Sequence, residues 1–232
     1  VREIGDGGYV FFVTQNGTVK RMELSVVNTE RKAGVKAISL EEGDRLEKVL
    51  HTSGDDRIIL ATRDGAAIRF HESEVRTMGR EAGGVRGIRL KEGDRVVGAD
   101  KEYPDSYLLT VTENGYGKRT LPAEFTEHHR GGGGITAHAL TDKTGALVGI
   151  RCVTGHDDLL LITGDGVVIR MGMEDIRICG RASQGVRLIR VEGEEKVISM
   201  TCTAKDDELA PEPGADGGEE TPSEAAEKTA EE

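Results

Sequence analysis

The sequence predicts an all-β, propeller-like fold of repeated four-stranded blades, because two markers recur with one period of about fifty residues. The first marker is an apolar run that enters an Asn-Gly or Asp-Gly turn and leaves with a basic residue. The second is a Gly-Val or Gly-Ile pair that opens another short strand. The turn glycines are Gly17, Gly65, Gly115 and Gly166, at spacings of 48, 50 and 51 residues. The paired glycines are Gly34, Gly84, Gly134 and Gly185, at spacings of 50, 50 and 51.

The second copy shows the expected strands in order. A β-branched run enters the Asp64-Gly65 turn and a second strand leaves it, because Asp-Gly accepts the positive φ angles of a tight hairpin. A polar link over residues 71–80 leads to a third strand, and the Glu92-Gly93-Asp94 turn leads to a fourth. The expected strands are residues 57–62, 66–70, 85–90 and 95–98.

Four short antiparallel strands in about fifty residues match the size of one propeller blade. Residues 1–204 are therefore expected to form about four blades, with repeats near 1–50, 51–101, 102–151 and 152–204. A β-solenoid is the alternative, although solenoid coils are usually shorter. We assign the glycines to turns, because they lack the strand-loop-helix setting and the Lys-Ser/Thr pair of a phosphate-binding loop.

Residues 205–232 differ from the repeats in composition. They contain eleven acidic residues, two lysines and no aromatic residue, which gives a net charge of −9. Such a segment cannot bury enough apolar surface to fold, so we predict a disordered acidic tail that either regulates a basic surface or only aids solubility. The whole chain carries −11, which leaves residues 1–204 near −2.

Basic residues recur in phase with the glycine markers, in three series. The first series follows the turn and contains Arg21, Arg69, Arg119 and Arg170, with Lys20 and Lys118 beside it. The second precedes the Gly-Val strand and contains Arg80, Arg130 and Arg181, with Arg31 and Lys32 nearby in the first copy. The third follows the Gly-Val pair and contains Lys36, Arg86 and Arg187, while Thr136 takes this place in the third copy.

Equivalent residues of successive blades lie at one height, so these series predict a basic band along one rim. A curved basic rim suits duplex DNA, which carries about one charge per 1.7 Å of its axis. With 3% aromatic residues and no Trp, we expect contacts to phosphates rather than to bases. Alternatively, the arginines form ion pairs that brace neighbouring blades. Spacing alone leaves both interpretations open.

Other chemistry has little support in the sequence. His128 and His129 are adjacent and lack Cys or carboxylate partners at ligand spacing, so no metal site is expected. Cys152, Cys179 and Cys202 are odd in number and indicate reduced thiols. No apolar run reaches the length of a membrane helix, and no signal peptide precedes the first repeat. We therefore expect a cytoplasmic protein with no membrane partner, and no enzyme activity from these residues alone.

Five segments carry a family pattern, in the order NGTVKR, GDDRIILATRDGAAIRF, ESEVRTMGREAGGVRGIRLKEGDRVV, TENGYGKRT and GRASQGVRLIR. They resemble the later blades of the C-terminal domain of the DNA gyrase A subunit, along residues 8–204. The resemblance implies a β-pinwheel, a six-bladed disc with DNA wrapped around its basic edge, of which this chain would be a partial arc. The related domain of the topoisomerase IV A subunit is an alternative, as is a propeller-like protein-interaction scaffold.

The resemblance also implies partners. In the family, wrapping lets a type II topoisomerase introduce negative supercoils with ATP, in a heterotetramer of two A and two B subunits. Duplex DNA and the rest of the heterotetramer are therefore the implied partners, in the bacterial cytoplasm at the nucleoid. ATP and Mg²⁺ would be bound elsewhere in the assembly, and no cofactor is expected in this chain.

Two departures from the family limit what the chain is expected to do. The diagnostic box Gln-(Lys/Arg)-Arg-Gly-Gly-Lys-Gly has its nearest match in residues 128–134, which keep only the Arg-Gly-Gly and the final Gly. The nucleophilic tyrosine of the DNA-cleaving region follows an arginine in the family. None of the tyrosines in this sequence has that neighbour: Tyr9, Tyr103, Tyr107 and Tyr116.

Overall fold

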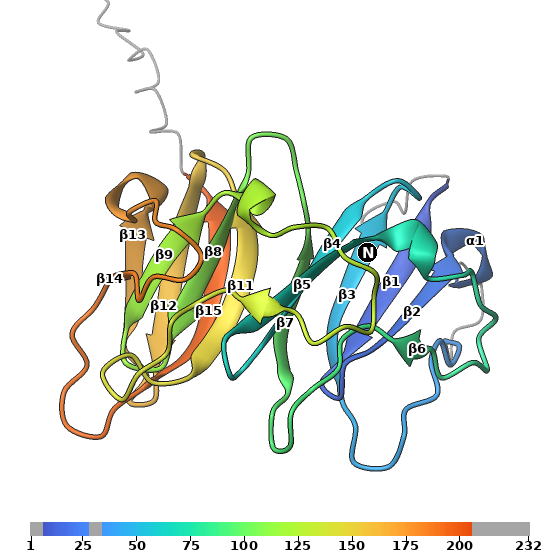
Figure 1. Ribbon diagram of the computed structural model, residues 1–232, viewed down its shortest axis with the longest axis horizontal. Coiled ribbons are helices and arrows are strands. Elements are labelled where there is room, and N and C mark those ends of the chain that lie inside the picture. The colour runs from blue at the N-terminus through green and yellow to red at the C-terminus, as the bar shows by residue number, and fades with distance from the viewer. Residues whose placement is uncertain (1–6, 28–33, 206–232) are drawn as a thin grey trace, which may run out of the picture.

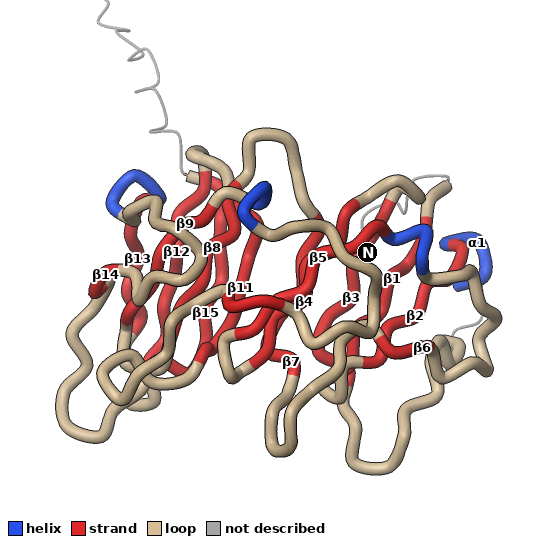
Figure 2. The backbone as a smooth tube through the Cα atoms, viewed as in Figure 1, coloured by secondary structure: helices blue, strands red, loops and turns tan. Residues whose placement is uncertain are grey.

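The chain forms four antiparallel β-sheets that stand side by side as successive blades (Figure 1, Figure 2). The computed structural model describes residues 7–27 and 34–205. The predicted all-β, propeller-like fold is confirmed. The acidic tail beyond residue 205 lies outside the described residues.

Within each blade, the strands follow one order from the inner to the outer edge. Blade 1 contains β3 (Leu46–Thr52), β1 (Tyr9–Thr14), β2 (Thr18–Glu23) and β6 (Val85–Arg86). Blade 2 contains β7 (Val96–Lys101), β4 (Arg57–Thr62), β5 (Ala66–His71) and β10 (Ile135–Thr136). Blade 3 contains β11 (Leu147–Val153), β8 (Tyr107–Thr112), β9 (Tyr116–Thr120) and β14 (Val186–Arg187). Blade 4 contains β15 (Val197–Ala204), β12 (Asp157–Thr163) and β13 (Val168–Gly172).

Short helical turns follow the third strand of each blade. They are α1 (Leu24–Val27) and the 3-10 helices η1 (Glu72–Glu74), η2 (Pro122–Glu124) and η3 (Met173–Asp175). In the described part of the chain, no helix is long and apolar enough to cross a membrane.

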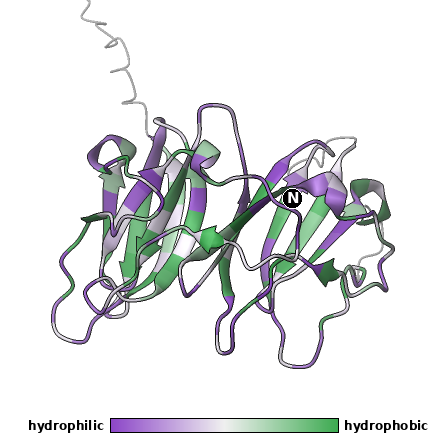
Figure 3. Ribbon diagram, viewed as in Figure 1, coloured by the Kyte–Doolittle hydropathy of each residue, from purple (hydrophilic) through white to green (hydrophobic). Residues whose placement is uncertain are grey.

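The second strand of an inner blade is buried on both faces, because each sheet is stacked between two others. Ile58 and Leu60 of β4 pack with Phe11 of blade 1, whereas Ile59 packs with Leu108 of blade 3. Alternate residues of a strand point to opposite faces, so β4 must be apolar throughout. Figure 3 shows this pattern, with hydrophobic residues along the strands and hydrophilic residues in the loops.

The outermost strand of each of the first three blades comes from the following repeat. β6 of the second repeat pairs with β2 of blade 1, in a register that places Val85 opposite Val19 and Arg86 opposite Thr18. β10 pairs with β5, and β14 pairs with β9, in the same way. The prediction that one repeat keeps all four of its strands is therefore wrong. Blade 4 has three strands among the described residues.

The predicted third strand is also shorter than expected, for a steric reason. An added Cβ at Gly87 would lie 2.5 Å from Cγ1 of Val19 and 3.2 Å from the carbonyl oxygen of Gly17. The chain therefore passes against blade 1 after two paired residues, and the amide of Gly87 donates to the Gly17 carbonyl over 2.8 Å. Residues 34–40 of the first repeat form no strand in the structure.

The turn glycines have two separate physical roles. Gly65 and Gly166 both have positive φ angles, of 81° and 87°, which side chains rarely adopt. A Cβ at Gly65 would also lie 2.8 Å from the carbonyl oxygen of His138, in the segment that the third repeat donates. Gly166 has open space, because no fourth strand among the described residues covers it.

Alanine substitutions at Gly166 and Gly65 separate the energetic cost of a side chain at positive φ from the energetic cost of disturbing the contact between blades. We expect Gly166→Ala to lower the free energy of unfolding by about 1 kcal/mol. Gly65→Ala should cost about 1–3 kcal/mol more, because the backbone of the donated segment must shift. Urea unfolding of the two variants measures the difference. Equal costs would show that the donated segment does not constrain the turn.

Candidate nucleic-acid interface

The three basic series predicted from the sequence lie in different environments. The first series is on the third strand of each blade, and the described members of the second are on the loops before the donated strands. In the third series, Arg86 and Arg187 are on donated strands, whereas Lys36 lies in a segment that forms no strand. The outer strands β6, β10 and β14 form a row across the arc, with β10 in front in Figure 1. Arg31 and Lys32 lie outside the described residues.

Three arginines of the first series, Arg21, Arg69 and Arg119, contact the next blade. Arg69 donates to Glu102 through Nε and Nη2, over 3.0 and 2.7 Å, and its Nη1 lies 3.4 Å from the Phe125 carbonyl oxygen. Nε of Arg119 donates to the carbonyl of Ile176 over 2.8 Å. Phe125 and Ile176 directly follow the 3-10 helices of the next blade. These contacts are the bracing geometry that the sequence left as the alternative.

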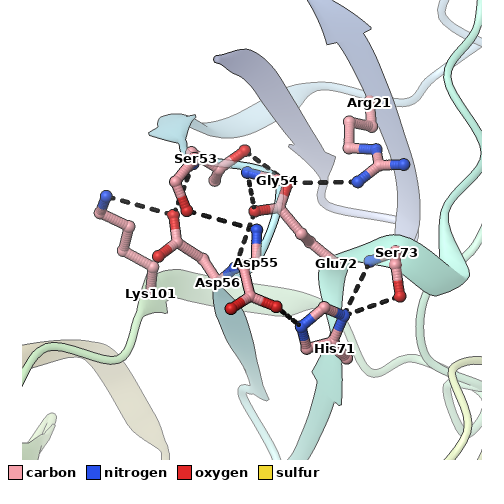
Figure 4. A network of polar contacts seen from close by, with 10 residues as sticks. Arg21, Ser53, Gly54, Asp55, Asp56, His71, Glu72, Ser73 and Lys101 are labelled. Atoms are coloured by element: carbon pink, nitrogen blue, oxygen red, sulfur yellow. Dashed lines mark hydrogen bonds and ion pairs between the residues drawn. The ribbon is translucent and has the colours of Figure 1, made fainter.

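The brace between blades 1 and 2 includes a fully buried carboxylate (Figure 4). Glu72 accepts hydrogen bonds from the Thr52 hydroxyl and from the amides of Gly54 and Asp56, over 2.7–2.9 Å. Nη1 of Arg21 lies 3.6 Å from the same carboxylate, and Arg21 is only 9% exposed. A buried charge needs such partners, so this network holds the β3–β4 connection against β2.

In blade 4 the corresponding arginine contacts its own sheet. Nε of Arg170 donates to Asp158 over 2.8 Å, and the side chain of Arg170 is 43% exposed. No later blade among the described residues offers it a 3-10 helix to contact.

Lys20 and Lys118 are fully buried, so the prediction that they belong to an exposed basic band is wrong. Nζ of Lys118 donates to the carbonyls of Gly180, Arg181 and Ser183 over 2.6–2.9 Å. Nζ of Lys20 donates in the same way to Ala37, Arg80 and Ala82 over 2.7–2.9 Å. Each ammonium group thus holds the loop before a donated strand. Burial lowers the pKa of Lys118 to about 8 and also lowers the pKa of Lys20.

The second series caps the open edge of the donated strands. Nη1 of Arg130 donates to the carbonyl of Arg86 over 3.0 Å, and Nη1 of Arg181 donates to the carbonyl of Thr136 over 3.1 Å. Each loop is anchored by a carboxylate, since the Arg130 amide donates to Glu74 and the Arg181 amide to Glu124. Both guanidinium groups therefore lie at the outer edge, and Arg80, Arg130 and Arg181 are all half-buried.

The third series is exposed. Lys36, Arg86 and Arg187 all have solvent-accessible side chains, and Arg187 also donates to the hydroxyl of Tyr116. Arg89 and Arg190 are exposed three residues beyond Arg86 and Arg187, although sequence reasoning missed them. Arg89 and Arg190 are 101 residues apart, or two repeats. The equivalent positions of the first and third repeats hold Ser39 and Ala139, which are not basic. A search for a period of two repeats would have found them.

The cysteines and histidines do not belong to the three basic series. Burial raises the pKa of the Cys152 thiol and raises that of Cys202 to about 11, so neither is a ready nucleophile. His128 is exposed, and Nδ1 of His129 lies 3.1 Å from Glu74. Within residues 7–27 and 34–205, no three His, Cys, Asp or Glu residues form a group that could hold a metal ion.

Burial of Lys118 predicts a distinctive pH dependence of stability. Its pKa of about 8 in the folded state lies below the ordinary 10.5, so the unfolded state binds more protons between these values. The free energy of unfolding of the wild type should rise by about 1–3 kcal/mol from pH 8 to pH 10, relative to that of Lys118→Met. Urea unfolding at several pH values measures this difference. A constant difference would show that the ammonium keeps an ordinary pKa.

Comparison with known proteins agrees with the repeat structure. A family model described as the DNA gyrase C-terminal domain, beta-propeller, matches residues 8–53, 56–101, 106–154 and 157–204. The DNA gyrase A subunit of Halalkalibacterium halodurans is 53% identical over 210 residues, which are 90% of this chain and 25% of the relative. The DNA gyrase A subunit of Clostridium acetobutylicum is 44% identical over 207 residues, which are 89% of this chain and 25% of the relative. The chain thus spans about a quarter of the length of these relatives.

Solved structures show the same architecture. The C-terminal domain of DNA topoisomerase IV has a TM-score of 0.81 at 29% identity, over 88% of this chain and 64% of that one. A DNA gyrase A C-terminal domain has a TM-score of 0.77 at 28% identity, over 86% of this chain and 67% of that one. Because the family model covers all four repeats, the chain belongs to the family of DNA gyrase C-terminal β-propeller domains.

Proposed function

We propose that this chain binds duplex DNA along its outer edge and wraps it, as the DNA-handling part of a gyrase A subunit. The observation that carries the proposal is the placement of exposed basic residues on the strands exchanged between blades. Arg86 and Arg89 belong to the segment that contains β6, and Arg187 and Arg190 to the segment that contains β14. Equivalent cations on the outer edges of blades 1 and 3 give a curved track for phosphates.

The proposed contact set differs from the set expected from the sequence. It keeps Lys36, Arg86, Arg130, Arg181 and Arg187 and adds Arg89 and Arg190. It omits Lys20 and Lys118, which are buried, and Arg21, Arg69 and Arg119, which contact the neighbouring blade. Because these residues offer charge and hydrogen-bond donors but no base-reading motif, we propose binding that tolerates different base sequences.

In the complete enzyme, this chain would serve a type II topoisomerase that introduces negative supercoils with ATP. Its partners would be the gyrase B subunit, together with the rest of the A subunit, in a heterotetramer of the bacterial cytoplasm. ATP and Mg²⁺ would be bound by those other parts, and the chain alone would not be an enzyme. The gyrase relatives, at up to 53% identity, favour a gyrase over topoisomerase IV.

Exposed and bracing arginines should have separable effects on binding. The triple change Arg86→Gln, Arg89→Gln and Arg190→Gln should weaken duplex binding and leave the free energy of unfolding nearly unchanged. The slope of log affinity against log salt should become shallower by about 0.9 for each lost phosphate contact. Fluorescence anisotropy with a labelled duplex at several salt concentrations measures both affinity and slope.

Arg69→Gln is the matched control. Its guanidinium is held by Glu102 and Phe125, so the change should lower the free energy of unfolding by about 1–3 kcal/mol and leave the salt slope unchanged. An unchanged slope in the triple variant, or a shallower slope in Arg69→Gln, would reverse the assignment of the two series.

A further inference from the structure

Blade 3 contains a hollow lined by four cations and two carboxylates. It has a volume of about 750 Å³ and lies between the Asn114-Gly115 turn and the segment that the fourth repeat donates. We call it the Tyr116 hollow, after the ring in its wall. The other charged residues that line it are Lys143, Arg187, Arg190, Glu194, Glu195 and Lys196.

Three hydrogen-bonding groups converge at the Tyr116 ring. Arg187 lies opposite Tyr116 in the β9–β14 register, and its Nε and Nη2 lie 3.2 and 3.0 Å from the phenol oxygen. Cζ of Arg187 is 5.5 Å from the ring centroid, and Nζ of Lys143 is 5.4 Å from it. The hydrogen bond from Arg187 is the main cause of a lowered pKa of Tyr116. Two cations and a hydroxyl group therefore face one small space.

Lys143 reaches this space because the third repeat replaces an acidic loop. The corresponding loops contain Glu41-Glu42-Gly43-Asp44, Lys91-Glu92-Gly93-Asp94 and Glu192-Gly193-Glu194-Glu195. Residues 141–145 read Thr-Asp-Lys-Thr-Gly instead. The amide group of Asn114 donates to the carbonyls of Asp142 and Lys143, over 3.1 Å each, and Thr144 is fully buried. The loop is therefore held in place before any ligand arrives.

The equivalent hollow of blade 1 provides the contrast. It is smaller, about 340 Å³, and has Thr18 and Arg86 where blade 3 has Tyr116 and Arg187. Glu41 and Asp44 line it, and no lysine of the described residues does. An anion would therefore gain one cation and meet two carboxylates in blade 1. In blade 3 it would also meet two carboxylates, of Glu194 and Glu195, but three cations, of Lys143, Arg187 and Arg190. Lys196 is already hydrogen-bonded to Asn114.

We infer that the Tyr116 hollow binds a phosphate group, and that in the DNA complex this group is a backbone phosphate of the duplex. The inference rests on the proposed function for the source of the phosphate. Arg187 and Lys143 supply positive charge, and the Tyr116 hydroxyl supplies a hydrogen bond that an unstructured basic rim lacks. Blade 3 then fixes the position of the duplex on the protein, whereas blade 1 makes only a general electrostatic contact.

Three single variants of the full chain test the site against a labelled duplex. Tyr116→Phe should weaken binding about fivefold with an unchanged salt slope, because it removes a hydrogen bond and no charge. Lys143→Gln should weaken binding and make the slope shallower by about 0.9. Lys91→Gln, an exposed lysine in the corresponding loop of the second repeat, should behave as the wild type. Thermal unfolding of each variant verifies that it is folded.

The outcomes separate this inference from the proposed function. If the wild type binds duplex and both Tyr116→Phe and Lys143→Gln bind equally well, the site is overturned and the proposed function stands. If the wild type binds no duplex, the proposed function fails. In that case, a titration with inorganic pyrophosphate that leaves the tyrosine fluorescence unchanged overturns the site as well.

Free phosphates identify the source of the ligand. Inorganic phosphate, pyrophosphate and ATP should each compete with the duplex only at millimolar concentrations if the site takes a backbone phosphate. Tight binding of ATP or pyrophosphate to the wild type, lost in Lys143→Gln while duplex binding is unchanged, would assign the hollow to a free ligand and overturn the DNA assignment.

Discussion

The structure depends on the backbone pairing of each donated strand with the sheet of the preceding blade. β6, β10 and β14 are only two residues long, yet each one ties two repeats together. Several other contacts between blades involve the donated segments. The buried lysines hold the loops that lead into β6 and β14, and Arg130 and Arg181 cap carbonyls of β6 and β10. Those capped carbonyls would otherwise remain open at an exposed strand edge.

The local elements were predictable because their causes are local. Asp64-Gly65 specifies a hairpin turn whatever surrounds it, and the apolar run of β4 matches a strand buried on both faces. The exchange was not predictable, because Val85-Arg86 has the same local pattern whether it pairs with its own sheet or with a neighbour. The close approach of Gly84 and Gly87 to Val19 distinguishes the two, and that approach is a tertiary contact.

The charged residues show the same limit. Lys20 and Arg21 are neighbours in the sequence, and their period resembles that of the exposed Arg86 and Arg187. Lys20 is nonetheless buried against backbone carbonyls, and Arg21 lies beside Glu72. In a repeated fold, basic residues that make contacts between blades recur with the same period as basic residues on the surface. Periodicity alone therefore cannot distinguish the two kinds of residue. The sequence contained one indication of this difference. Successive side chains of a strand point to opposite faces, so Lys20 and Arg21 could not point to the same surface.

The alternation between odd and even blades has a mechanical consequence. The cation-rich strands β6 and β14 are attached to blades that contain a buried lysine, whereas β10, with Thr136, is attached to a blade that has Ile68 in that place. A duplex following this edge would be neutralised in patches rather than evenly. Its curvature would then concentrate where the patches lie, and flexible pyrimidine–purine steps would be favoured there at regular intervals, without any contact to a base.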